Sequence, residues 1–199
     1  MNEVGISLGY NCYPASNGVQ LGIRKTKNNG YNTCPFDEMW TNFPGLLQCL
    51  NDNFYYFCDP TYLSVTSTIH GPMIYNSKYK FVFNHESPGH ADLYISQKWE
   101  GGINHFVDNN FEKFIARYNK RIESFRNYLL DKRNFITFIL LRYKTSPACL
   151  NLLNSAIRKY RETNYKILLC DANKEEAKFG LTLSLFDEND EEFIRLNDE

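Results

Sequence analysis

The sequence lacks the segments that mark several large classes of protein. No apolar run approaches the roughly 18 residues of a transmembrane helix, and no apolar leader segment precedes Val4. The cysteines form no CxxC pair, which argues against the usual zinc spacings and against a disulfide scaffold; they stand at positions 12, 34, 49, 58, 149 and 170. We therefore expect a cytoplasmic protein without membrane contact, metal or cofactor, whose thiols stay reduced.

Phosphate-binding loops and an excess of one charge are also missing. Neither GxGxxG nor GxxxxGK[ST] occurs. With 22 Lys and Arg against 23 Asp and Glu, the net charge is -1, so no overall field attracts nucleic acid. We expect no nucleic-acid partner, and the sequence carries no signal for an oligomeric state.

What is present is enough for a substantial core. The chain has 199 residues, 43% of them hydrophobic, and its aromatic side chains include 15 Phe and 14 Tyr. The last 13 residues, 187–199, carry seven acids against one Arg and are predicted to form a solvated acidic tail. We expect one domain over 1–186 with this tail after it.

Apolar spacing predicts the α/β class. Apolar residues recur every three or four positions across 111–129, which indicates a helix, and the runs at 135–143 and 165–173 are continuous apolar strands around a helix at 147–161. Strand, helix, strand in this form is typical of a parallel sheet covered by helices. We predict a three-layer fold with a mainly parallel sheet in the C-terminal half and an irregular, aromatic-rich insertion after the first strand. Within the insertion we expect a helix at 44–51 and strands at 61–67 and 78–85, with a turn at 70–73.

A cysteine follows the first expected strand. In VGISLGYNCYP, from Val4 to Pro14, an apolar run ends in a Gly turn that leads directly to Cys12. Backbone N–H groups at such a junction can face an anion, and an electropositive, partly exposed site lowers the pKa of a thiol. Cys12 is therefore a candidate nucleophile, and a small buried core residue is the alternative.

The motifs that follow carry a family resemblance. They are SLGYNC (7–12), LGIR (21–24), PFDEMWTN (35–42), FNHE (83–86), FEKFIARYNKRIESF (111–125) and FITFILLRY (135–143). In this order the sequence resembles a domain family of unknown function that is grouped with the papain-like cysteine peptidases. The resemblance implies Cys12 as nucleophile and His85 as base, with the cysteine at a helix start and the histidine on an antiparallel sheet. Two motifs depart from the usual pattern: PFDW reads PFDE here, with Trp40 supplying the aromatic ring, and Glu86 stands where Asp is common.

A cysteine hydrolase also needs an acid that orients the imidazole and donors for the oxyanion. For the acid the family pattern favours Asp37, with Glu86 and Asp171 as alternatives; Asp37 could instead cap a helix that begins near Glu38. Asn11 or the backbone N–H of Cys12 could donate to the oxyanion. Three other histidines are rival bases: His70, His90 and His105. Of these, His90 is nearest to His85 in the sequence.

Two other functions stay open. Arg142 and Asp171 are expected near the ends of the two C-terminal strands, at the sheet edge where ligands bind in such folds. They could bind an anionic sugar or nucleotide donor, or they could pair with each other. The polar side of the helix at 111–129 and the residues just after it carry seven basic side chains against three acids, which either form a solvated surface or face a phosphate, sugar nucleotide or acidic peptide. The third possibility is a non-catalytic interaction domain. The expected substrate is thus a peptide or a small anion.

Overall fold

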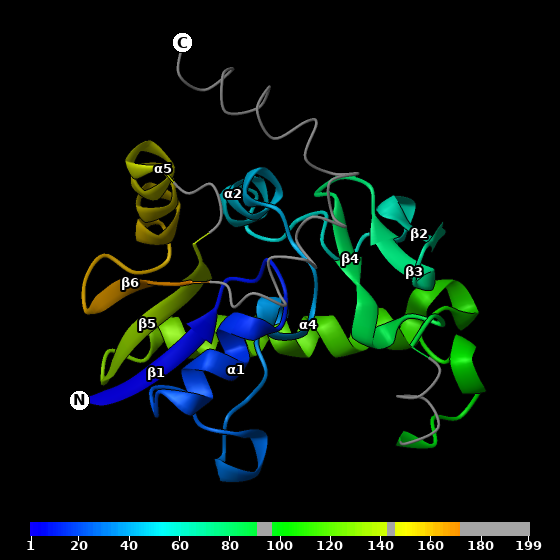
Figure 1. Cartoon of the computed structure of the whole chain (residues 1–199), viewed down its shortest axis with the longest axis horizontal. Helices are drawn as coiled ribbons and strands as arrows, with labels where there is room; N and C mark the ends of the chain where they lie inside the picture. Colours follow the sequence, from blue (N-terminus) through cyan, green and yellow to red (C-terminus); the bar gives the residue numbers. More distant parts are fainter. Residues whose placement is uncertain (91–96, 143–145, 172–199) are drawn as a thin grey trace.

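The computed structural model describes residues 1–90, 97–142 and 146–171 (Figure 1). The acidic tail predicted at 187–199 and the end of the expected domain, 172–186, lie outside these residues. Within the described part no helix combines the length and the apolar character needed to cross a membrane.

Three parallel strands form the first sheet. β1 (Asn2–Ser7), β5 (Asn134–Leu141) and β6 (Tyr165–Cys170) lie in the order β1-β5-β6, and β5 pairs with both neighbours. All but one residue of β5 are buried, because the central strand of a parallel sheet is covered on both faces. The predicted parallel sheet is confirmed, and its first strand comes from the N-terminus of the chain.

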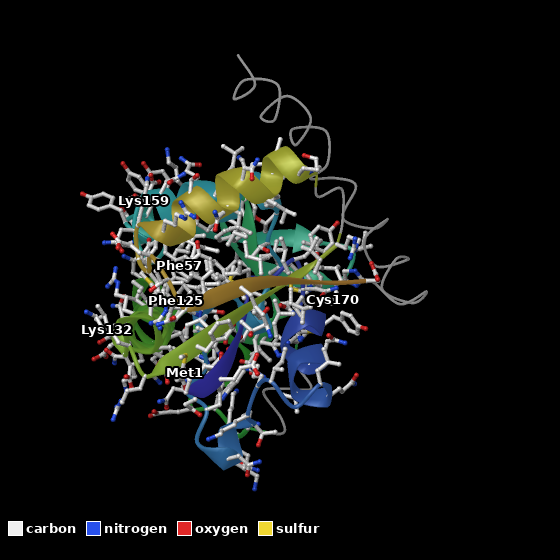
Figure 2. The ribbon with its side chains drawn as sticks, turned by 90° about the vertical axis from the view of Figure 1, so that its left-hand side faces the viewer. Met1, Phe57, Phe125, Lys132, Lys159 and Cys170 are labelled. Atoms are coloured by element: carbon white, nitrogen blue, oxygen red, sulfur yellow. The ribbon has the colours of Figure 1, made fainter. Side chains whose placement is uncertain are left out.

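Helices cover both faces of this sheet. α1 (Tyr13–Gln20) lies on one face, and α5 (Pro147–Arg158) lies on the other (Figure 2). The side chains of β5 alternate accordingly: Ile139 and Leu141 cluster with Tyr10 and Tyr13 near α1, whereas Phe138 belongs to the large core. The three-layer α/β class is therefore confirmed.

The longest helix, α4 (Asp108–Leu130), spans the two halves of the molecule (Figure 1). Three residues near its start, Asn109 to Phe111, have positive φ, so regular turns begin after them. Further along, Tyr118 packs on Phe83 of the insertion, and Phe125 packs on Phe138 of β5. The predicted apolar stripe thus joins the two sheets through one helix.

The insertion between β1 and α4 contains an antiparallel sheet. α2 (Phe43–Asn51) comes first, and then β2 (Leu63–Thr68), β3 (Gly71–Asn76) and β4 (Phe81–Phe83) pair in sequence order. The turn expected at 70–73 is wrong. Gly71 adopts φ +93° and starts β3, which leaves only two residues to reverse the chain after β2. The strand expected at 78–85 is likewise shorter, because His85 lies in a 3₁₀ turn, η4 (Asn84–Glu86).

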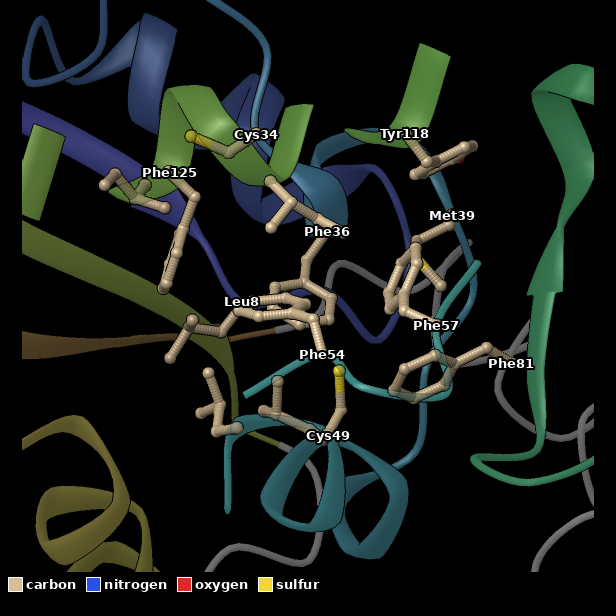
Figure 3. Close-up of a cluster of buried hydrophobic side chains, with 14 of the residues drawn as sticks. Leu8, Cys34, Phe36, Met39, Cys49, Phe54, Phe57, Phe81, Tyr118 and Phe125 are labelled. Atoms are coloured by element: carbon tan, nitrogen blue, oxygen red, sulfur yellow. The ribbon is translucent and has the colours of Figure 1, made fainter. Parts of the chain in front are cut away.

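Aromatic side chains fill the space between the two sheets (Figure 3). Phe36 contacts Phe54, Phe57, Phe81 and Phe125, with ring centroids 5.7 to 6.4 Å apart. Phe36 comes from the 3₁₀ turn η2 (Pro35–Glu38), so the PFD motif is tied to the core by its Phe. This contact holds the neighbouring acids, Asp37 and Glu38, in fixed positions.

Candidate active site around Cys12

A tight turn presents Cys12 at the start of α1. After β1 ends at Ser7, Gly9 and Tyr10 take φ values of +87° and +76°, and Cys12 then occupies the N-cap position. Asn11 is buried, and its Oδ1 accepts a hydrogen bond from the Tyr13 backbone N–H at 2.9 Å. The first turn of α1 contains no acid, so no carboxylate of the helix's own first turn offsets the partial positive charge of its N-terminus.

The turn is held against Thr41. The Tyr10 N–H donates to Thr41 Oγ1 at 2.5 Å, and the Thr41 N–H donates back to the Tyr10 carbonyl at 3.2 Å. A Cβ on Gly9 would lie 2.5 Å from Thr41 Oγ1, so only glycine fits here. Tyr10 is a non-glycine residue at positive φ, a strained backbone conformation. Such strain concentrates at functional sites.

Cys12 differs from the other thiols in its exposure. Of the six cysteines, all within the described ranges, Cys12 alone is exposed. Burial raises the pKa of Cys34 and Cys49 well above the ordinary thiol range and that of Cys58 to about 12. The alternative interpretation of Cys12 as a small buried core residue is therefore wrong, because Cys12 comes after the end of β1 and is exposed.

His85 lies beyond the end of the antiparallel sheet. It follows β4 within η4, and its ring centroid is 5.6 Å from that of His90. Backbone hydrogen bonds in both directions join Val82 of β4 to Trp40, the neighbour of Thr41. The segment with Trp40 and Thr41 is therefore hydrogen-bonded both to the turn that precedes Cys12 and to the strand that precedes His85.

The other two histidines lie elsewhere. The ring of His70 is 5.6 Å from the ring of Trp40, and its side chain is exposed in the turn before β3. His105 stacks on Trp99 at 5.6 Å, just before α4. His85 and His90 thus form one pair of neighbouring imidazoles.

Asp37 is buried and bound by other groups. Its carboxylate lies 3.1 Å from Arg24 Nη2, accepts a hydrogen bond from the Cys34 N–H at 2.7 Å, and accepts one from the Tyr31 hydroxyl. Burial raises the pKa of Asp37 against the effect of Arg24. The helix expected to begin near Glu38 instead ends there, because Asp37 closes η2 by bonding back to Cys34.

Two glutamates meet the arginines of α4. Glu86 is buried, and its carboxylate lies 2.9 Å from Arg117 Nε and 3.2 Å from Arg121 Nη2, while Tyr118 donates a hydrogen bond to it at 2.9 Å. Glu38 lies 2.6 Å from Arg121. Although burial opposes it, Arg121 lowers the pKa of Glu38 to about 2, with help from Lys27 and His85.

The motif positions Asp37, Glu38 and Glu86 are thus all paired with arginine. Sequence reasoning missed the partners, and it also missed Glu38 as the acid that lies electrostatically close to His85. The available signal was the pair Arg117 and Arg121, which stand four residues apart beside the apolar stripe of α4.

Arg142 and Asp171 pair with each other at the carboxyl edge of the parallel sheet. Arg142 Nε lies 2.8 Å from Asp171 Oδ1, and both side chains are more than half exposed. The interpretation as an internal pair is confirmed for these two residues. The residues that flank Cys12, Tyr10 and Tyr13, pack on the same edge through Leu141 and Cys170.

No metal site is formed by the parts of the chain that the structure describes, since no three His, Cys, Asp or Glu side chains gather there. Comparison with known proteins gave one result. The family model described as "Putative papain-like cysteine peptidase (DUF1796)" matches residues 3–172. No curated protein and no solved structure matches the chain. Because the family match spans most of the sequence and includes every motif discussed above, this chain belongs to that family.

Proposed function

We propose that this protein is a cysteine hydrolase or acyl transferase in which Cys12 is the nucleophile and His85 the general base. The exposure of Cys12 at the N-terminus of α1 carries the proposal, because the other five cysteines are buried or half-buried and Cys12 stands at a helix start. The family match supports the same class of chemistry.

In the proposed reaction the Cys12 thiolate attacks the carbonyl carbon of an acyl substrate. The C–N or C–O bond of the substrate breaks, and the leaving group takes the proton held by His85. A water molecule or an acceptor then attacks the thioester and releases the acyl group, which returns the proton to the histidine. The proposed oxyanion donors are the Cys12 N–H and the side-chain amide of Asn11, whose oxygen is already held by Tyr13.

The third member of the site is assigned by charge. Asp37 is the family's choice, but its carboxylate is bound to Arg24, Tyr31 and the Cys34 N–H. Glu38 interacts electrostatically with His85, and its low pKa keeps it ionised at neutral pH. We therefore assign Glu38 as a positioning residue for His85, and Asp37 as the residue that fixes the PFD turn.

The test is the rate at which iodoacetamide alkylates Cys12 as a function of pH, read by peptide mass spectrometry against free N-acetylcysteine. We expect a half-maximal rate below the ordinary thiol pKa of about 8.5. His85→Ala should move the midpoint back towards that value, and the matched variant His90→Ala should leave it in place. A midpoint at or above 8.5 in the parent protein contradicts the proposal. A shift caused by His90→Ala alone transfers the role of base to His90.

A second readout addresses acyl transfer itself. Incubation with p-nitrophenyl acetate should acetylate the parent protein at Cys12, and Cys12→Ser should remove the modification at that position. Acetylation that spreads equally over surface lysines, with none at Cys12, would contradict a nucleophilic role.

A further inference from the structure

The basic side of α4 lines a pocket that the proposed hydrolase does not use. The pocket has a volume of about 640 Å³, within the range of small-molecule sites, and neither Cys12 nor His85 lines it. Its walls come from α4, from the loop after η1 (Lys27–Asn29) and from the segment around the 3₁₀ turn η5 (Gly102–Asn104).

Positive charge dominates the lining. Five cationic side chains and no carboxylate line the pocket; the cations are Lys27, Lys113, Arg117, Lys120 and Arg121. On α4, Arg117 follows Lys113 by four residues, and Lys120 and Arg121 follow Arg117 by three and four, which places them on one side of the helix. This side is the basic surface that the sequence predicted.

The acids behind the lining do not neutralise it. Glu38 and Glu86 pair with Lys27, Arg117 and Arg121, and Glu100 lies 3.4 Å from Lys113. Five cations against three carboxylates leave two positive charges. The Glu100 side chain is 92% exposed, so its pair with Lys113 is weak, and Lys120 forms no ion pair with any described residue.

A buried guanidinium points to a missing anion in this region. Arg121 lines the pocket although only 5% of its side chain is exposed, and its Nη1 has no hydrogen-bond partner. Buried charged donors are normally satisfied, so an arginine in this state calls for a further acceptor or for more negative charge nearby. An anion bound in the adjoining pocket would supply that charge.

Aromatic rings also line the pocket. Trp99 is half-buried and stacks on His105, and Phe106 lies beneath Arg117 at 5.2 Å from the guanidinium carbon. A wall of this kind excludes water from one side of the cations, which strengthens their attraction for an anion.

From these observations we propose that the pocket binds a small molecule through a phosphate or diphosphate group. A phosphate monoester carries close to two negative charges at neutral pH, which matches the two uncompensated positive charges, and lysine and arginine are its usual ligands. The proposal does not rest on the role of Cys12, because neither Cys12 nor His85 lines the pocket. The two regions meet at Glu38, which pairs with Lys27 and Arg121 of the pocket.

The test is isothermal titration of the full chain with sodium pyrophosphate, with ADP and with adenosine at low ionic strength. Pyrophosphate probes the phosphate group alone, and ADP probes the same group attached to a ring that can lie against Trp99. We expect both to bind and adenosine not to bind. Absence of binding by pyrophosphate and ADP overturns the proposal, and so does adenosine binding as tightly as ADP.

Paired variants locate the binding. The double variant Lys113→Gln with Lys120→Gln removes two pocket charges from exposed or half-buried positions. It should lower the affinity for pyrophosphate at least about tenfold, the factor expected for the loss of one good charged contact. Lys80→Gln with Lys132→Gln removes the same charge from exposed positions outside the pocket and should leave the affinity nearly unchanged. Equal affinities of the two double variants would show that binding depends on overall charge and would overturn the site.

Discussion

Substitution of Glu38 by Gln tests the charge network behind the PFDE motif. Glu38 has 22% of its side chain exposed and lies 2.6 Å from both Lys27 and Arg121. Burial by itself disfavours the carboxylate, but Arg121, Lys27 and His85 outweigh it and lower the pKa of Glu38 from 4.5 to about 2. A fall of this size corresponds to about 3 kcal/mol of folding free energy at neutral pH.

The sign of the pH dependence follows from the lowered pKa. An acid whose pKa is lower in the folded state stabilises the fold above pH 4.5, and the contribution is lost as the pH falls towards about 2. We expect Glu38→Gln to lower the free energy of unfolding by about 3 kcal/mol at pH 7, or the melting temperature by about 6–12 °C. Near pH 3.3 the difference from the parent should be about half as large.

Urea unfolding followed by circular dichroism at several pH values measures both quantities. Glu100→Gln is the matched control, because the Glu100 side chain is 92% exposed and its loss should cost less than about 0.5 kcal/mol. Equal stability of Glu38→Gln and the parent at pH 7 would refute the reasoning. A difference that stays constant from pH 7 to pH 3.3 would refute it as well, since the effect would then not depend on ionisation.

Two further substitutions test the scaffold by thermal and urea unfolding. Gly9→Ala should lower the free energy of unfolding by about 3 kcal/mol, because it combines a positive φ with a collision at Thr41. Gly22→Ala, at φ +70° in open space, should lower it by only about 1–2 kcal/mol. Equal losses in the two variants would show that the collision does not contribute. Arg161→Lys should cost about 2–3 kcal/mol, because the buried guanidinium donates to four backbone carbonyls that an ammonium cannot reach together. Arg158→Lys, at an exposed position of α5, is its control, and an equal effect of the two would contradict the role of the carbonyl contacts.

The sequence predicted the regular elements well where their pattern is local. The apolar spacing of α4 and the continuous runs of β5 and β6 identify these elements within a few residues of their bounds. It predicted the small sheet less well. β3 was missed because Gly71 and Pro72 are turn formers, and they start a strand only because the two-residue turn before them brings β3 against β2.

The candidate site divides in the same way. The motif order proposed Cys12, His85 and Asp37 as site residues, which stays a prediction, but it could not assign the partners of the acids. Arg121 lies 83 residues from Glu38 in the sequence, and their contact depends on how α4 crosses the PFDE turn.

By itself, then, the sequence determined the α/β class, the long amphipathic helix and the family. These depend on patterns that repeat over a few residues or on motifs read in order, and both are properties of the chain as a string. Only the tertiary structure decided that Cys12 is the exposed thiol, that Arg142 pairs with Asp171, and that the cations of α4 line a pocket. Exposure and ion pairing depend on distances between segments far apart in the sequence, which are set when the two sheets pack around the shared aromatic core.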